Sequence, residues 1–147
     1  MKETLHENHV KRLEQFKNVL KQWHHHPLSF YGKATVIKSI AFPKLNHVIA
    51  NLSTPEWFVQ ETQACIFDFL WSGKNAKVKN DVVINSYNRG GLQIPHVESY
   101  VIAQKAIWVK RMTTNKNAAW LELLQPNLPE MPLADLLRCN VKNEDLC

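Results

Sequence analysis

The regular spacing of apolar residues is the feature that most constrains how this chain can fold. In the first segment they recur every three to five residues, and polar residues fill the positions between them. That spacing is typical of an amphipathic helix with one apolar face. The apolar positions of this first helix are Leu5, Val10, Leu13, Phe16, Leu20 and Trp23. The pattern ends at three histidines before Pro27, because proline disfavours helical geometry at the residue before it.

Two further helices are predicted from their start and stop signals. Ser29 is a suitable N-cap for the second helix, which has a broad apolar face and which Pro43 should kink or split. The sequence Ser-Thr-Pro-Glu at residues 53–56 predicts a capping box at the start of the third. This third helix is the most apolar, so we expect it to be the core element, and Ser72-Gly73 should end it.

The chain after the third helix is predicted to be basic and partly extended. A basic loop (residues 74–80) comes first. The β-branched residues at 82–84 then predict a brief strand or extended segment. A turn at 88–91 would let residues 92–94 pair back on it as a small hairpin. We therefore expect one short β-hairpin or extended segment near residues 77–94.

A fourth helix at about residues 96–112 completes a chain that is mostly helical, and a short helix near 133–138 follows a proline-broken stretch. The predicted fold class is therefore mainly α, a helical bundle. We divide the chain into an N-terminal amphipathic helix (1–26), a helical domain with the basic loop (27–116) and a proline-broken acidic C-terminal segment (117–147).

Charge is distributed unevenly along the 147 residues. The net charge is +5, but the part through Lys116 holds 16 lysines and arginines against 8 acidic residues, whereas the remainder holds 2 against 5. The basic part is a candidate for contact with a polyanion such as nucleic acid. A solvated surface with surplus lysine is the alternative, and composition alone does not separate the two.

Several classes of protein are disfavoured by the sequence. No apolar run reaches the roughly 20 residues that cross a bilayer, so no membrane partner is expected. The first residues are polar and carry acids, unlike a secretory signal. Cys65, Cys139 and Cys147 are odd in number and far apart, which disfavours a disulfide framework or a CxxC metal pair. We expect an intracellular protein, nuclear or cytoplasmic.

The motifs of a nucleotide, metal or catalytic site are incomplete or absent. Gly32-Lys33 resembles part of a phosphate-binding loop, but proline and alanine stand where that loop needs glycine and Ser or Thr. The three adjacent histidines at 24–26 have diverging side chains, which rarely close one metal site. There is no Gly-x-Ser-x-Gly elbow, and Cys65 falls within an apolar helix. We expect neither catalysis nor a cofactor.

Basic residues interleaved with aromatic ones remain as the candidate binding feature. That mixture suits a groove that follows a phosphate backbone, although core tryptophans explain the aromatic residues equally well. The basic residues are Lys33, Lys38, Lys44, Lys74, Lys77, Lys79, Arg89, Lys105, Lys110 and Arg111.

Four phrases, taken together and in order, resemble one family. They are LSFYGKATVIKSIAFPKLNHVIANL at 28–52, FDFLWSGKNAKVKND at 67–81, NRGGLQIPHVESY at 88–100 and AIWVKRM at 106–112. The string resembles the region just after the polymerase palm in reverse transcriptases of LINE-type non-LTR retrotransposons. The family pattern includes Leu-Ser-x-x-Gly-Lys/Arg, Phe-x-Trp-x-Gly-Lys, a basic Lys-x-Lys and Gly-Gly-Leu. The resemblance covers about residues 13–112.

The resemblance implies a thumb-like helical bundle, which in such polymerases grips the template–primer duplex, and the connector after it. The nucleic-acid-binding residues that it implies are Lys33, Lys38, Lys74, Lys77, Lys79, Arg89, Lys110 and Arg111. It also implies that Trp71, Gly73, Gly90 and Gly91 shape the fold rather than touch substrate. Asn80 and the histidine run stand where the family often has basic residues, which weakens contact there.

The chemistry of that family is not implied for this chain alone. Polymerisation needs carboxylates that hold two Mg²⁺ ions, and the family supplies them from a palm, whereas this sequence has no Asp-Asp pair. We expect a non-catalytic fragment whose partners are an RNA–DNA duplex and the missing palm and fingers. A helical protein-interaction module, or a remnant with no selected activity, is the alternative, and the oligomeric state stays open.

Overall fold

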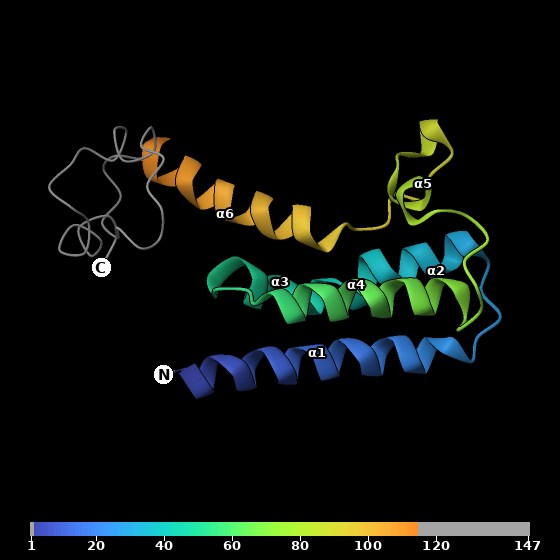
Figure 1. The fold of residues 1–147 in the computed structure, drawn as a ribbon, viewed down its shortest axis with the longest axis horizontal. Coiled ribbons are helices and arrows are strands. Elements are labelled where there is room, and N and C mark those ends of the chain that lie inside the picture. Colours follow the sequence, from blue (N-terminus) through green and yellow to red (C-terminus); the bar gives the residue numbers. More distant parts are fainter. Residues whose placement is uncertain (1, 115–147) are drawn as a thin grey trace, which may run out of the picture. The chain divides into compact units, whose positions relative to one another are not determined.

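The chain divides into two compact units, Met1–Gln104 and Lys105–Cys147. The computed structural model describes residues 2–114. All elements of this part are helical, so the predicted mainly α bundle is confirmed (Figure 1). They are α1 (Lys2–His24), α2 (Phe30–Val36), the π-helix η1 (Ile37–Ala41), α3 (Pro43–Asn51), α4 (Glu56–Trp71), α5 (Asn80–Ile84), the 3₁₀-helix η2 (Tyr87–Arg89) and α6 (Val97–Thr114).

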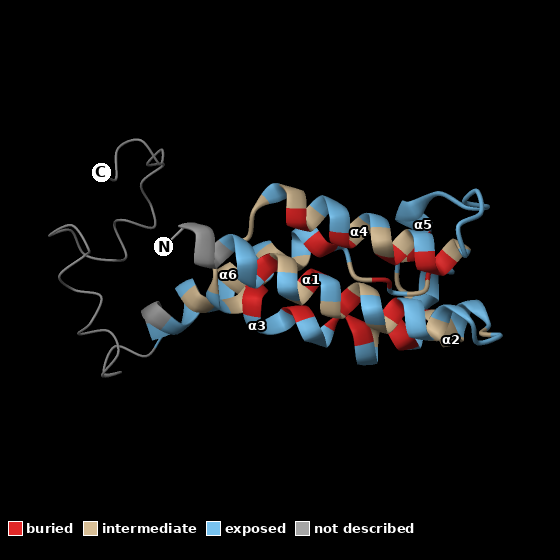
Figure 2. Cartoon of the chain, turned by 90° about the horizontal axis from the view of Figure 1, so that it is seen from below, coloured by how far each residue is buried: buried red, intermediate tan, exposed pale blue. Residues whose placement is uncertain are grey.

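Three helical rods enclose the core of the first unit. One is α1, one is α4, and the third is the continuous run of α2, η1 and α3. α1 contacts η1, α3 and α4, and α2 contacts α4. Figure 2 shows the buried residues along the sides where these rods face one another, with exposed residues on the outer sides.

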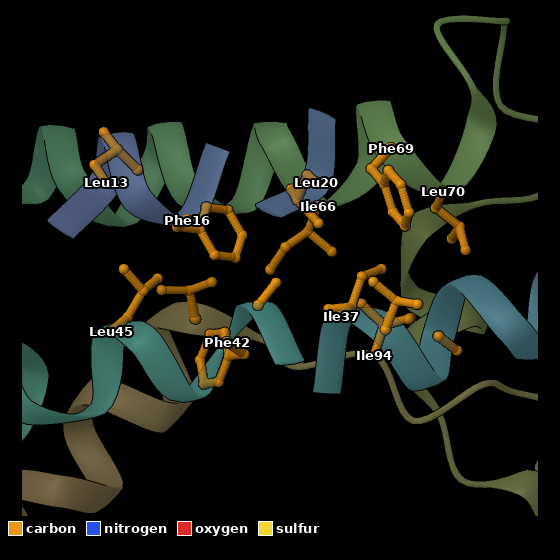
Figure 3. Close-up of a cluster of buried hydrophobic side chains, with 14 of the residues drawn as sticks. Leu13, Phe16, Leu20, Ile37, Phe42, Leu45, Ile66, Phe69, Leu70 and Ile94 are labelled. Carbon is orange, nitrogen blue, oxygen red and sulfur yellow. The ribbon is translucent and has the colours of Figure 1, made fainter. Parts of the chain in front are cut away.

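The core confirms the periodicity predicted for the first and third helices. Leu13, Phe16 and Leu20 of α1 are buried in one cluster with Ile66 and Phe69 of α4, and Figure 3 shows these side chains pointing toward the third rod. Burying one such side chain stabilises the fold by roughly 1.5–3 kcal/mol. The amphipathic face of α1 therefore joins the core of the following helices within one unit.

Pro43 splits the second helix, as predicted, but the chain does not leave the helical path. Proline has no N–H, and in an α-helix its ring would collide with the carbonyl four residues earlier. A π-turn precedes it instead, in which the Phe42 amide donates to the Ile37 carbonyl at 2.8 Å. Pro43 then stands in the first turn of α3, where the missing donor costs nothing.

The two predicted N-caps have opposite outcomes. Ser29 caps α2, and its Oγ accepts from the Gly32 amide at 3.1 Å. The capping box predicted at residues 53–56 is wrong, because the N-cap of α4 is Pro55 and no side chain caps it. Capping by Ser53 would require Thr54 to be helical, and a following proline disfavours that geometry.

The strand predicted at residues 82–84 is also wrong. These residues form the short helix α5, which buries Val83. β-propensity depends on a neighbouring strand and a half-buried surface, and α5 has no neighbouring strand within residues 2–114. Residues 91–96 form the return segment. Within it residues 92–94 do come back as predicted: the amides of Leu92 and Ile94 donate to the Val83 carbonyl at 2.9 and 3.4 Å. The predicted hairpin is therefore a loop closed onto one helical turn.

The predicted fourth helix is confirmed as α6, and a side chain of α4 fixes its start. Gln63 Oε1 accepts from the Val97 amide at 2.8 Å, which satisfies one of the free donors at the helix start. Tyr100 packs edge-on against Phe42, with ring centroids 4.9 Å apart. No helix among residues 2–114 is both long and apolar enough to cross a membrane. The segment at 117–147, with its predicted helix, lies outside the described residues.

Candidate nucleic-acid interface

Lys33 projects from α2 onto the end of α4. Its Nζ donates to the carbonyl oxygens of Phe69 and Leu70, both at 3.1 Å, and to Ser72 Oγ. The last carbonyls of a helix have no partner within the helix, and a cation there also suits the helix dipole. Lys33 therefore caps the C-terminal end of α4, although it belongs to α2.

This engagement leaves Lys33 little capacity for phosphate. An ammonium group has three N–H donors, and three protein acceptors surround this one. Burial, and then the charge of Lys74 nearby, lower the pKa of the Lys33 ammonium below its ordinary value. Lys33 thus lies within electrostatic range of the basic loop, but its contacts are structural.

Two phrases of the family resemblance meet at this point. One carries Phe30 and Lys33, and the other carries Trp71 and Ser72. The rings of Phe30 and Trp71 lie 5.5 Å apart in an edge-on arrangement. Ser72 and Gly73 both adopt left-handed backbone geometry, with φ of 54° and 68°, and so turn the chain into the basic loop.

Lys38 of η1 has a similar role at the return segment. Its Nζ donates to the Tyr87 hydroxyl at 2.7 Å and to the Leu92 carbonyl at 3.1 Å, and it lies 4.9 Å from the centre of the Tyr87 ring. These contacts connect η1 to η2 and to the chain that follows. One N–H donor of Lys38 remains for a further acceptor.

The lysines of the basic loop are arranged differently. Lys74, Lys77 and Lys79 are all exposed, and the loop leading to α5 is exposed throughout (Figure 2). Their ammonium groups have no hydrogen-bond or ion-pair partner among residues 2–114. Lys77 and Lys79 line a shallow concavity together with Asp81. These three charges are available to a ligand.

Arg89 lies on η2, which follows α5 in the same unit, and it is exposed. Figure 1 shows α5 and the loop before it at the end of the bundle where α2 begins. The two glycines after Arg89 set the local path. Gly90 has a φ of 75°, and a Cβ on Gly91 would lie 2.0 Å from the Asn85 carbonyl oxygen. Only glycine permits so close an approach.

The remaining predicted residues belong to the second unit. Lys110 and Arg111 are exposed on α6, and the Arg111 guanidinium lies 5.2 Å from the centre of the Trp108 ring. The structure therefore associates Lys33, Lys38, Lys74, Lys77, Lys79 and Arg89 within one unit, and it places Lys110 and Arg111 in the other.

Two exposed tyrosines were not singled out by sequence reasoning. The rings of Tyr31, on α2, and Tyr87, on η2, lie 6.4 Å apart with an angle of 28° between their planes. The aromatic residues as a class carried a signal, but nothing in the sequence pairs residues from two separate elements.

A second surface feature lies between α1 and α4. It is a groove of about 540 Å³ whose lining includes Leu20, Ala64 and Phe69, with Lys17 and Lys21 among its polar members. Cys65 also lines it, and burial raises the pKa of that thiol above its ordinary value. A raised pKa suits the predicted role of Cys65 as a small apolar side chain, because only the thiolate is a good nucleophile.

Comparison with known proteins assigns no family and no related structure to the chain. No family model matches the chain, and no solved structure matches it. Within residues 2–114, no group of three His, Cys, Asp or Glu side chains is placed to hold a metal ion.

Proposed function

We propose that this chain is a nucleic-acid-binding module whose basic loop contacts the phosphate backbone of a duplex. The single observation that carries the proposal is the state of Lys74, Lys77 and Lys79, three exposed ammonium groups on one loop without partners among residues 2–114. Exposed lysines attract phosphate and release the counterions bound to it. Arg89 adds a fourth cation on the neighbouring helical turn.

The role that fits both this surface and the sequence resemblance is that of a reverse-transcriptase thumb, which holds template–primer duplex without taking part in the chemistry. Contact with the backbone of an RNA–DNA duplex, in an intracellular setting, is the corresponding proposal. We assign no polymerisation to the chain, because the carboxylates that would hold Mg²⁺ are not among its motifs.

The test is a titration of the full chain against an RNA–DNA duplex, followed by fluorescence anisotropy at several salt concentrations. The triple variant Lys74→Glu, Lys77→Glu, Lys79→Glu should bind at least about tenfold more weakly. Its plot of log K against log salt should flatten by roughly 0.9 for each phosphate that the variant no longer neutralises.

The matched control changes the net charge equally at another surface. Lys11, Arg12 and Lys21 lie on α1, away from the residues of the candidate interface, and their triple change to Glu should weaken binding far less. Equal decreases in affinity for the two variants would show that binding follows net charge alone, and would refute a role for the basic loop.

The alternative is a helical protein-interaction module, and the groove between α1 and α4 favours it. Its apolar lining could receive an apolar side chain or helix face of a protein partner. Such a contact would be insensitive to salt and to the charge changes in the basic loop, so the same titrations distinguish the two functions.

A further inference from the structure

Two tyrosine rings are exposed side by side at the end of the first unit that carries the basic loop. Tyr31 of α2 is 65 % exposed and Tyr87 of η2 is 48 % exposed. Their ring centres lie 6.4 Å apart, and the 28° angle between their planes makes the pair nearly parallel. Core rings such as Phe58 and Phe69, in contrast, are buried. Core packing therefore does not explain this pair.

The Tyr87 ring is held by a contact that does not involve Tyr31. Lys38 donates a 2.7 Å hydrogen bond to the Tyr87 hydroxyl and packs 4.9 Å from the centre of that ring. The backbone of Tyr31 is fixed in the first turn of α2, where its main-chain carbonyl accepts from Thr35 Oγ1 at 2.9 Å. A ring fixed before binding loses less conformational freedom when a ligand stacks on it.

Two cations belong to the Tyr87 side of the pair. Lys38 touches Tyr87, and Arg89 is exposed two residues further along the same helical turn. An exposed ring beside a cation matches a nucleotide, since the base offers a π-face and its phosphate offers a negative charge. An apolar protein partner would gain nothing from the charges and would have to desolvate them.

We propose that Tyr31 and Tyr87 form an aromatic platform on which an unpaired base stacks. The inference rests on the proposed function, and it specifies the ligand further as a duplex that continues into a single-stranded overhang. The basic loop would contact the duplex backbone, and the platform would take a base of the overhang.

The test compares one RNA–DNA duplex in two forms, blunt and with an overhang that carries the fluorescent base aminopurine. The full wild-type chain should bind the overhang form about tenfold more tightly and should quench the aminopurine fluorescence, which reports stacking. The Tyr31→Leu, Tyr87→Leu double variant should lose the preference and the quenching, yet should bind the blunt duplex like the wild type.

The Tyr31→Phe variant is the matched control, because it keeps the ring face and removes only the hydroxyl. It should retain the preference and the quenching. The quenching on wild-type protein needs no variant, so it tests the platform even where a leucine variant fails to fold.

The outcomes separate this inference from the proposed function. Equal binding of the two duplex forms by the wild type, with sensitivity to the basic-loop charges retained, overturns the platform and leaves the proposed function standing. A leucine variant that loses affinity equally for both forms also overturns the platform, and points to a protein or structural role for the rings. Absence of any duplex binding by the wild type refutes the proposed function and the platform together.

Discussion

Two groups of lysines in the first unit have different roles. Lys33 and Lys38, the tethered lysines, donate hydrogen bonds to carbonyl and hydroxyl groups of distant elements. The lysines of the basic loop have no such partner among residues 2–114. Lys33 and Lys74 both belong to a Gly-Lys pair. The comparison shows that a basic motif can serve either the fold or a ligand, and that the nearest acceptor decides which.

The largest expected decrease in the free energy of unfolding comes from a substitution in the return segment, whose Leu92 carbonyl accepts a hydrogen bond from Lys38. Replacing Gly91 by alanine would press a Cβ against the Asn85 carbonyl, which lies 2.0 Å from the Cβ position. We expect a decrease of about 3 kcal/mol in the free energy of unfolding, measured by urea denaturation.

The neighbouring glycine is the control for that substitution. Gly90→Ala introduces strain through its φ of 75° but meets no atom within 4 Å, so about 1 kcal/mol is expected. If Gly91→Ala lowered the free energy of unfolding no more than Gly90→Ala, the backbone of the return segment would have shifted to accommodate the Cβ. The hydrogen bonds of Lys38 to that segment would then contribute little to stability.

The next largest effect is expected when one lysine of each group is replaced by methionine. Lys33→Met should lower the free energy of unfolding by about 2 kcal/mol, because carbonyls at the end of α4 lose a charged donor. Lys74→Met should change it by less than about 0.5 kcal/mol, as is usual for an exposed side chain. Thermal or urea unfolding of the two variants gives the comparison, and equal decreases would contradict the distinction between tethered and available lysines.

The smallest effect belongs to a third arrangement, the ion pair of Lys17 on α1 with Glu61 on α4. Both side chains are largely exposed, so the pair should stabilise the fold by only about 0.5 kcal/mol. Hydrogen bonding to Glu61 raises the pKa of Lys17 above 10.5. A raised pKa of a base means that this stability is complete below 10.5 and is lost as the pH rises through the folded-state pKa.

The pH dependence of stability in Lys17→Met measures that contribution. The gap between wild type and variant should hold from neutral pH towards 10.5 and shrink at higher pH. Lys21→Met, one turn further along α1 and exposed, is the control and should show no such gap. A gap that persisted at high pH would assign the effect to packing of the Lys17 methylenes instead.

Most of the helices could be predicted because their signals are local. The spacing of Leu13, Phe16 and Leu20 gives α1 an apolar face, whichever helix packs against that face. Ser29 caps α2 by accepting a hydrogen bond from Gly32, only three positions away. The two errors have different causes, one local and one tertiary. At residues 53–56 the proline before the glutamate excluded the capping geometry, and at 82–84 β-branched residues lacked a strand to pair with.

The sequence by itself determined the helical rods, the breaks at Pro27 and Pro43 and the excess of positive charge, because periodicity, proline geometry and residue charge depend on near neighbours. Only the tertiary structure decided that Lys33 closes α4, that Lys74 stays open to solvent, and that Tyr31 meets Tyr87. Each of these depends on which acceptors or rings from distant parts of the chain come within a few ångströms, and packing of the rods sets those distances.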